Sequence, residues 1–335
     1  MDYTRYEIRK KSGGVRVIYA PNKELKLKLR GILSNLEDSC GKDISVLAHG
    51  FVKERNCKTN AQKHSGKKYV VNMDIKDFFP SCRANYFYTL VVSQIDKTKF
   101  IHQGVDQQTT GTRLFDNVFR YCFIDGSLPQ GFPASPFLAN LYLSKFDRVA
   151  VSVLRKHVSS DIIYTRYADD ITVSSDSRAV EKAVEVIDKI LTSYGFELNS
   201  NKTKFMHRGM RQEITGLNVN SGKVTIGKEY RRKIRAIIHR AKDCGWIITK
   251  GQKQTVEGMI GHVALCHPKE AGRYREMLRE VKTVDKMPGR LIGKEIVRVK
   301  AKGKIKAVKR GSCNTEGGNT EGGCGGNGIS RRITI

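Results

Sequence analysis

The sequence predicts an α+β fold in which an antiparallel sheet packs on helices, and three stretches support this prediction. Residues 162–174 contain two segments rich in β-branched and aromatic residues, which fold back on each other about Tyr167-Ala168-Asp169-Asp170. Residues 69–81 form an apolar run of strand type that ends at Asp74 and turns into Pro80. Residues 128–141 begin with a Gly- and Pro-containing entry and continue with apolar residues at helical spacing.

Acidic residues end both predicted strand regions. If the two strands are neighbours in one sheet, Asp74 lies next to Asp169 and Asp170 in a single cleft. Neighbouring carboxylates repel each other, and a divalent cation such as Mg²⁺ offsets that repulsion with oxygen ligands. Such a site with two ions performs phosphoryl transfer. For the hairpin tip alone, the alternative is a polar turn in which one Asp caps the backbone and the other is solvated.

The charge of the chain predicts a polyanionic partner. Lys and Arg outnumber Asp and Glu by 61 to 33, which gives a formal net charge of +28. A membrane surface is the rival explanation, but no apolar run approaches the roughly 18–20 residues of a membrane span. The segment Met1-Asp-Tyr-Thr-Arg-Tyr-Glu also lacks the apolar core of a signal peptide. We therefore expect a nucleic-acid-binding protein of the cytoplasm that has no membrane partner.

The cysteines favour the same compartment. There are eight, and none forms a Cys-x-x-Cys pair. Reduced, mostly buried thiols are the expectation. A zinc site built from Cys244, His262, Cys266 and His267 is the alternative, although this spacing matches no common zinc finger.

The order of the three stretches resembles the palm of reverse transcriptases. This resemblance implies a right-hand polymerase and an RNA-directed DNA polymerase activity with two Mg²⁺ ions, Mn²⁺ being possible. It implies that Asp74, Asp169, Asp170 and the Ile75 backbone bind the metal ions. It also places Phe79 and Gln130 beside the incoming dNTP, with Lys11 and Arg16 of an N-terminal hairpin on the triphosphate. Lys202, in Asn199-x-x-Lys202-Thr203, matches the segment that supplies a general acid; a plain exposed lysine is the alternative.

Two weaker motifs narrow the resemblance to retron reverse transcriptases. Asn60-Ala-x-x-His64 precedes Asp74, and Ile214-Thr215-Gly216 follows the hairpin where that family has Val-Thr-Gly. The resemblance implies a structured noncoding RNA as template and primer source, an RNA-linked single-stranded DNA product (msDNA), and antiphage defence with an effector protein in bacteria. The alternatives are a group II intron-like or diversity-generating enzyme, or a non-catalytic RNA–DNA scaffold that restrains a toxic effector.

The predicted domains are fingers and palm interleaved over 1–226, a helical thumb over 227–285, and a basic, glycine-rich tail over 286–335. Amphipathic patterns predict helices at 23–36, 177–194, 228–240, 255–266 and 269–281, and helical stretches at 86–95 and 112–123. The tail segment 295–309 is predicted to be either an edge strand or a disordered basic arm. The residues expected to contact RNA are Asn60, His64, Thr215, Gly216, Arg231, Arg232, Arg235 and Arg240.

Overall fold

A four-stranded antiparallel sheet lies at the centre of the computed structural model, which describes residues 2–10, 13–92, 107–243, 246–285 and 297–298. Its strand order is β4-β5-β3-β6, and the strands span Ile163–Tyr167, Asp170–Ser175, Tyr69–Asp74 and Lys204–His207. Tyr69 pairs with Ser175 and Asp74 with Asp170. The hairpin predicted from residues 162–174 and the neighbouring strand predicted before Asp74 are therefore both confirmed.

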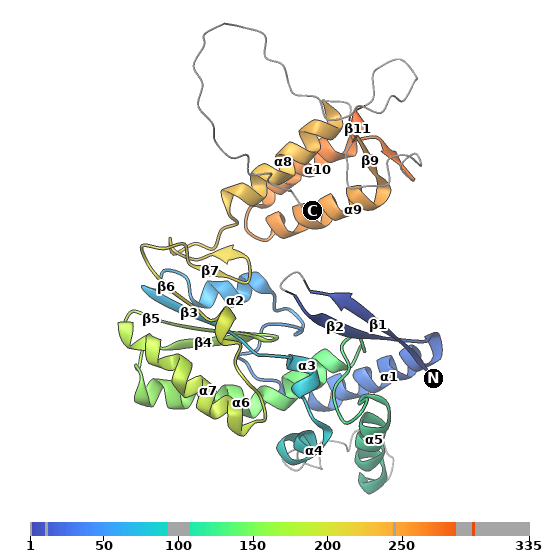
Figure 1. Ribbon diagram of the computed structural model, residues 1–335, viewed down its shortest axis with the longest axis vertical. Helices are drawn as coiled ribbons and strands as arrows, with labels where there is room; N and C mark the ends of the chain where they lie inside the picture. The colour runs from blue at the N-terminus through green and yellow to red at the C-terminus, as the bar shows by residue number, and fades with distance from the viewer. Residues whose placement is uncertain (1, 11–12, 93–106, 244–245, 286–296, 299–335) are drawn as a thin grey trace, which may run out of the picture.

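The two faces of this sheet belong to different hydrophobic cores. Val71 and Met73 pack in a large core with helices α6 (Ser135–His157) and α7 (Ala183–Ser193). Val70 and Met206, whose side chains point to the other face because strand residues alternate, pack in a second core. Figure 1 shows α6 and α7 below the sheet and α2 (Cys57–Lys63) with β7 (Glu213–Ile214) above it.

The N-terminal part of the chain forms the fingers. Strands β1 (Tyr3–Arg9) and β2 (Val15–Pro21) form the predicted hairpin and are followed by helix α1 (Lys23–Cys40). The Asn22 side chain accepts a hydrogen bond from the Leu25 N–H and caps α1, while Leu25, Leu29, Ile32 and Leu36 bury one face of it. This helix confirms the amphipathic pattern.

Short helical segments surround the palm. They are the 3₁₀ helix Gly41–Asp43, α3 (Phe78–Ser81), α4 (Ala84–Phe87), a π-helix (Tyr88–Val92), α5 (Gln107–Tyr121), and the 3₁₀ helices Arg178–Lys182 and Ser200–Lys202. The predicted helix at 177–194 is thus a 3₁₀ turn that continues into α7. It ends at Gly195, whose φ of +81° suits glycine.

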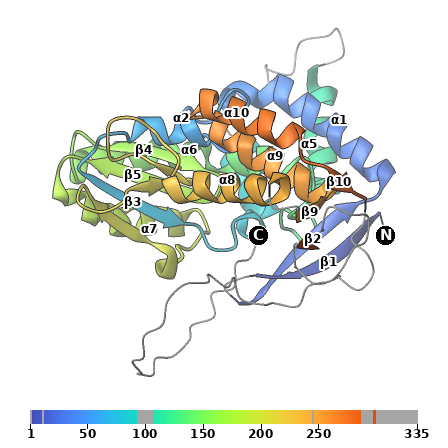
Figure 2. The same cartoon turned by 90° about the horizontal axis from the view of Figure 1, so that it is seen from above.

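Three helices form a separate layer above the palm, seen in Figures 1 and 2. They are α8 (Lys228–Lys242), α9 (Lys250–Ala264) and α10 (Pro268–Arg279), which confirms the three helices predicted for the thumb. Their buried residues share the second core with Ala61, Val70 and Met206 of the palm. The hairpin of β7 (Glu213–Ile214) and β8 (Leu217–Asn218) contributes Ile214 and Leu217 to the same core.

A small sheet of order β10-β9-β11, not predicted from the sequence, joins the thumb helices. It contains β9 (Trp246–Thr249), β10 (Thr283–Val284) and β11 (Val297–Arg298). Strand β11 pairs antiparallel with β9, so two residues of the predicted tail are in a strand. The remainder of the tail segment 295–309 lies outside the described residues.

The described cysteines Cys40, Cys57, Cys82, Cys122 and Cys266 are reduced, and Cys40, Cys82 and Cys122 are buried. Cys244 of the alternative zinc site lies outside the described residues. A search of the described part of the chain for a helix long and apolar enough to cross a membrane finds none.

Candidate active site

The structure brings the three predicted carboxylates together at one end of the palm sheet. Asp74 ends β3 directly opposite Asp170, the first residue of β5, and Asp169 lies in the tight turn before it. The Ile75 N–H donates a hydrogen bond of 2.9 Å to the Asp169 carbonyl, which ties the end of β3 to this turn. Ala168 has a φ of +57°, a left-handed conformation that the surrounding contacts must stabilise.

Burial and mutual repulsion perturb these carboxyl groups. Burial, with the charges of Asp169 and Asp74, raises the pKa of Asp170 to about 6. Burial also raises the pKa of Asp169, and the charge of Asp74 adds to this effect. A group of neighbouring carboxylates with raised pKa values is typical of a site that binds cations or protons.

Lys202 supplies a positive charge to this group. Its Nζ donates hydrogen bonds of 2.8 and 3.0 Å to the two carboxylate oxygens of Asp74, and the hydrogen bond raises the Lys202 pKa. The Lys202 side chain is 55% exposed, whereas that of Asp74 is 13% exposed. An exposed cation on a flexible stem can leave this carboxylate when a competing cation arrives.

The chemistry of the donors fits a hard divalent cation, because three carboxylates supply oxygen ligands and repel one another without one. As the side chains stand, with Lys202 on Asp74, the described residues contain no group of three or more His, Cys, Asp or Glu that could hold a metal ion. Displacement of Lys202 from Asp74 would therefore accompany cation binding.

A fully buried arginine, Arg166, supports the turn that carries Asp169 and Asp170. Arg166 of β4 donates from Nε and Nη2 to the two carboxylate oxygens of Asp147, at 2.9 and 2.8 Å. Its Nη1 donates to the Asn140 side chain at 2.9 Å and to the Ala168 carbonyl at 3.1 Å. Arg166 thus holds the left-handed residue beside Asp169. The sequence analysis missed this role, although a charged residue inside an apolar strand is a visible signal.

The segment 47–51 braces the same turn from another side. The Arg166 N–H donates to the Leu47 carbonyl, and the His49 N–H donates to the Arg166 carbonyl at 2.7 Å. A Cβ on Gly50 would lie 2.5 Å from the Ala168 nitrogen, so only glycine fits there. Phe51, which follows it, is 55% exposed and lies beside Phe79, with 6.4 Å between ring centroids. The sequence alone predicted no role for this segment.

Of the residues expected at the nucleotide, Arg16 and Phe79 lie near this turn, and Lys11 is outside the described residues. Arg16 is exposed on β2, and its charge lowers the pKa of Asp169 against the larger effect of burial. Phe78 is buried in the core and Phe79 is partly buried, as expected if Phe79 is the exposed member of the pair. The Gln130 carbonyl accepts a 2.8 Å hydrogen bond from the Tyr19 N–H and so joins its loop to β2.

The structure contradicts direct RNA contact by Asn60 and His64, because both side chains are fully buried. The two ring nitrogens of His64 lie 2.7 Å from the Ser174 and Thr165 hydroxyls, and burial lowers the His64 pKa to about 3. The amide of Asn60 is buried with no hydrogen-bond partner in the described part of the chain. In this conformation the motif links α2 to the palm sheet rather than presenting a surface to RNA.

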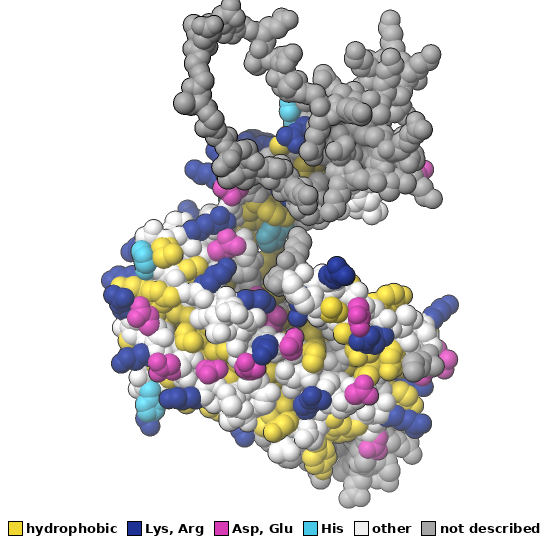
Figure 3. All heavy atoms as spheres, viewed as in Figure 1, with side chains coloured by type: hydrophobic (Ala, Val, Ile, Leu, Met, Phe, Trp, Pro, Cys, Tyr) yellow, Lys and Arg dark blue, Asp and Glu magenta, His cyan; other side chains and the backbone are white. Residues whose placement is uncertain are grey.

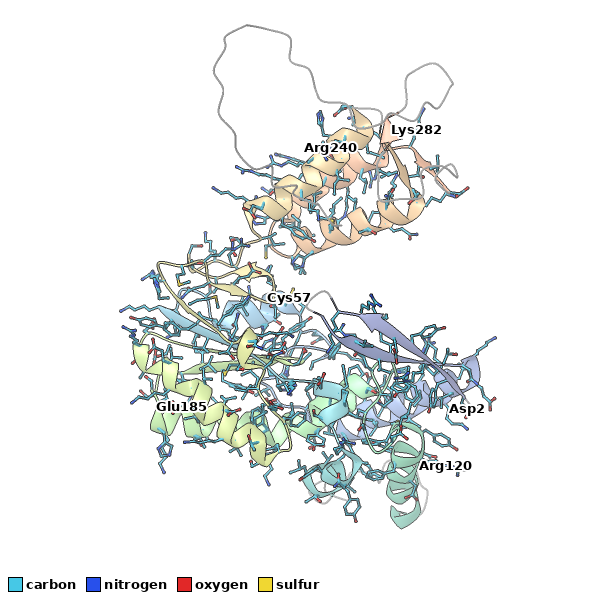
Figure 4. The ribbon with its side chains drawn as sticks, in the orientation of Figure 1. Asp2, Cys57, Arg120, Glu185, Arg240 and Lys282 are labelled. Carbon is cyan, nitrogen blue, oxygen red and sulfur yellow. The ribbon has the colours of Figure 1, made fainter. Side chains whose placement is uncertain are left out.

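The other predicted RNA contacts differ in accessibility. Thr215 and Gly216 form the β7–β8 turn with φ values of +47° and +81°, and Gly216 is exposed. The Thr215 hydroxyl donates to the Cys57 carbonyl at 3.3 Å, and Figure 4 shows Cys57 on the side of the palm that faces the thumb. Arg231 is paired with Glu270 at 2.6 Å, whereas Arg232, Arg235 and Arg240 are exposed on α8.

Comparison with known proteins gives the family of this chain. The family model of the reverse transcriptase (RNA-dependent DNA polymerase) matches residues 8–254. A solved structure of telomerase from Candida albicans with a fragment of telomeric RNA is similar over 82% of this chain and 54% of that one, with a TM-score of 0.49 and 14% identity. Because that family model covers well over half of the chain, the chain belongs to the reverse transcriptase family of RNA-dependent DNA polymerases.

Curated relatives place it more narrowly. The retron Ec86 reverse transcriptase of Escherichia coli is 32% identical over 292 residues, which cover 86% of this chain and 83% of that protein. The retron Mx65 reverse transcriptase of Myxococcus xanthus is 31% identical over 280 residues, which cover 81% of this chain and 63% of that protein. Within the family, the chain is a member of the retron reverse transcriptases.

Proposed function

We propose that this chain synthesises DNA on an RNA template at the Asp74, Asp169 and Asp170 site. The observation that carries this proposal is the register of the palm sheet, which sets Asp74 against Asp170 with Asp169 in the adjoining turn. Two Mg²⁺ ions, or Mn²⁺ in their place, would be held by the three carboxylates and the Ile75 backbone. When bound, they would activate a 3′-hydroxyl and stabilise the leaving pyrophosphate.

The surrounding residues would orient the incoming nucleotide. Arg16 lies on β2, and its positive charge lowers the pKa of Asp169. This position suits a contact between the Arg16 guanidinium and the triphosphate. Phe79 would pack under the deoxyribose and exclude a 2′-hydroxyl, while Gln130 lies in a loop held against β2. Lys202 would give a proton to the pyrophosphate after releasing Asp74, with Lys11 also on the phosphates.

The biological reaction we propose is that of a retron. Part of a structured noncoding RNA would serve as template and the same RNA as primer source, and the product would be msDNA, a single-stranded DNA joined to that RNA. An effector protein would then complete an antiphage defence system in the bacterial cytoplasm. The support for this is the similarity to retron enzymes over most of the chain.

Recognition of the cognate RNA would depend on the thumb. The palm carries the chemistry that all relatives share, whereas α8 exposes Arg232, Arg235 and Arg240. Figure 4 shows Arg240 and Lys282 on the thumb layer. Duplex RNA is recognised largely through its shape, phosphates and 2′-hydroxyls, which are contacts that such arginines make. Asn60 and His64 would act indirectly, by fixing the palm surface beneath the thumb.

The experiment that tests the retron function is to sequence the nucleic acid that copurifies with the full chain, before and after ribonuclease treatment. We expect one structured RNA joined to one DNA strand, the DNA being complementary to part of the RNA. Recovery of only fragmented cellular RNA without any DNA would contradict the proposal.

A domain exchange tests the proposed role of the thumb. Exchange of residues 227–285 for those of another retron enzyme should transfer RNA preference. A chimera that keeps its original preference would show that the thumb does not select the RNA.

A further inference from the structure

A pocket of about 490 Å³ opens on the palm at the end of the sheet away from the carboxylates. Its lining includes two aromatic rings and four side chains that are cationic or can become so: Tyr69, Phe205, Lys68, Arg178, His207 and Arg208. Lys68 and Tyr69 lie at the beginning of β3, and Phe205, His207 and Arg208 lie at the end of β6. Arg178 is the first residue of the 3₁₀ helix Arg178–Lys182. Figure 3 shows Lys and Arg side chains along this end of the palm, with Asp and Glu side chains among them.

The pocket is separated from the active site both along the sheet and across it. Tyr69 and Asp74 are the first and last residues of β3, so their Cα atoms are about 16 Å apart. They also point to opposite faces, because successive strand residues alternate. Tyr69 and Phe205 pack against the core that contains α6 and α7, whereas Asp74 shares the parity of Val70, which faces the thumb. A ligand in this pocket is therefore not the duplex being extended.

The aromatic residues form a platform for a planar group. Tyr69 and Phe205 are stacked, with ring centroids 5.9 Å apart and an interplanar angle of 22°. Both rings are partly buried at the margin of the core, and both line the pocket. Stacking on such rings stabilises a bound nucleobase by about 1–3 kcal/mol and tolerates any base.

The charges around the platform favour a phosphate. Of the acidic residues nearby, Glu181 is paired with Arg178 at 3.0 Å, and Asp176 is paired with Lys67 at 2.8 Å. The Lys68 N–H donates to the Asp176 carboxylate at 3.1 Å, but the exposed side chains of Lys68 and Arg208 form no ion pair in the part of the chain that the structure describes. Two cationic side chains without ion pairs beside an aromatic platform are the combination that single-stranded nucleic acid recognises.

His207 adds an oriented donor. Its Nδ1 accepts a 3.1 Å hydrogen bond from the Gly209 N–H. In the neutral ring the proton is therefore on Nε2, which can donate to a phosphate or to a base edge. The pocket thus offers stacking, fixed charge and a directed hydrogen-bond donor within one volume.

We propose that this pocket is a second nucleic-acid site, which binds a single-stranded segment with a base on the Tyr69 and Phe205 platform and phosphates on Lys68 and Arg208. A duplex is excluded because its bases are stacked on each other and offer no free face. In a retron complex this site would hold an unpaired segment of the RNA or of the new DNA strand behind the palm while synthesis continues at the front.

The test uses the full chain freed of copurified RNA by ribonuclease and high salt. The variant Lys68→Glu with Arg208→Glu changes two exposed side chains and leaves the platform intact. The matched control, Lys156→Glu with Lys189→Glu, makes the same charge change at exposed positions of α6 and α7 outside the lining. Binding of fluorescent oligouridylate and oligothymidylate is measured across a salt series, with uridine monophosphate as a competitor.

We expect the pocket variant to bind both oligonucleotides roughly tenfold more weakly, with a salt slope smaller by about 1.4, since each lost phosphate contact contributes about 0.7 for a single strand. Oligouridylate carrying 5-iodouridine should crosslink to the peptides of Tyr69 or Phe205 in the wild type. A preference for one oligonucleotide identifies the strand that the site takes. Equal losses in the control, absence of these crosslinks, or competition by the monophosphate at the concentration of the oligonucleotide would each overturn the proposal.

This outcome is independent of the proposed polymerase function. Extension of a short primer–template should be unchanged in the pocket variant, because the altered residues lie at the opposite end of β3 from Asp74. If the wild type extends no primer, the polymerase assignment fails while the binding measurement and the crosslinks still decide the pocket.

Discussion

The ammonium of Lys202 lies 2.8 Å from one carboxylate oxygen of Asp74 and 3.0 Å from the other. This contact joins the residue proposed as a general acid to a residue proposed as a metal ligand. Because the side chain of Lys202 is more than half exposed, the pair can separate when a divalent cation takes the carboxylate.

Replacement of Lys202 by Gln should slow DNA synthesis by roughly 10²–10⁴-fold, which is the usual contribution of a positioned general acid. Binding of the primer–template should stay within about twofold, because the palm and thumb are unchanged. Single-turnover incorporation of one dNTP measures the effect. A rate within threefold of wild type would assign Lys202 to the exposed surface rather than to catalysis.

Replacement of Phe79 by Ala should admit ribonucleotides. Phe79 is the partly buried member of its pair and touches Phe51, whereas Phe78 is buried in the core. The discrimination between dNTP and rNTP is measured as a ratio of kcat/KM values, with Phe51→Ala as the comparison. Unchanged discrimination in Phe79→Ala would show that the ring serves packing alone.

Replacement of Arg166 by Leu should destabilise the chain by about 3–5 kcal/mol, because it leaves the buried Asp147 carboxylate without its partner. Adding Asp147→Leu should recover part of the lost stability, because both buried charges are then removed. Urea unfolding of the two variants measures this. The double variant should still synthesise DNA poorly, because Arg166 also holds the Ala168 carbonyl beside Asp169. Full activity in the double variant would contradict that supporting role.

His64 should make the chain sensitive to acid. Its pKa is about 3 in the folded chain and about 6.5 when unfolded, so the unfolded state binds more protons between these values. Stability from this group is fully present above about pH 6.5 and falls as the pH is lowered, by up to about 1.4 kcal/mol per pH unit. The His64→Gln variant should be less stable at neutral pH and should lose this part of the slope.

The exposed His157 provides the control for that measurement. Urea unfolding between pH 7 and about pH 5 is compared for wild type, His64→Gln and His157→Gln. The His157 variant should follow the wild-type slope. An unchanged slope in His64→Gln would mean that His64 titrates alike in the folded and unfolded chain, which the complete burial of its ring argues against.

Local patterns predicted much of this fold. The alternation of residues 162–174 and the apolar run before Asp74 each determine a strand, and the amphipathic spacing of residues 23–36 determines a helix. The meeting of Asp74 with Asp170 follows once those strands are adjacent. The small sheet of β9, β10 and β11 was not predicted, because strands of two to four residues are too short to show a recognisable pattern.

The hydrogen bonds that support the site could not be predicted from local sequence patterns, because they join segments that are far apart in the sequence. Asn140 donates to the Gly50 carbonyl across 90 residues, and His64 contacts Ser174 across 110. Sequence alone also cannot distinguish a buried His from an exposed one, since both satisfy the same motif. For this reason the motif of Asn60 and His64 was assigned to RNA contact, whereas the structure buries it against the palm.

The central claim is that the carboxylates of the β4–β5 turn carry out RNA-directed DNA synthesis. Asp169→Asn with Asp170→Asn removes two neighbouring anions that repel each other, so the fold should be at least as stable as wild type and RNA binding should be retained. Primer extension on an RNA template with Mg²⁺ is the direct measurement. We expect no DNA product from the double variant beside a normal product from wild type, whereas full-length DNA from the double variant would contradict the account.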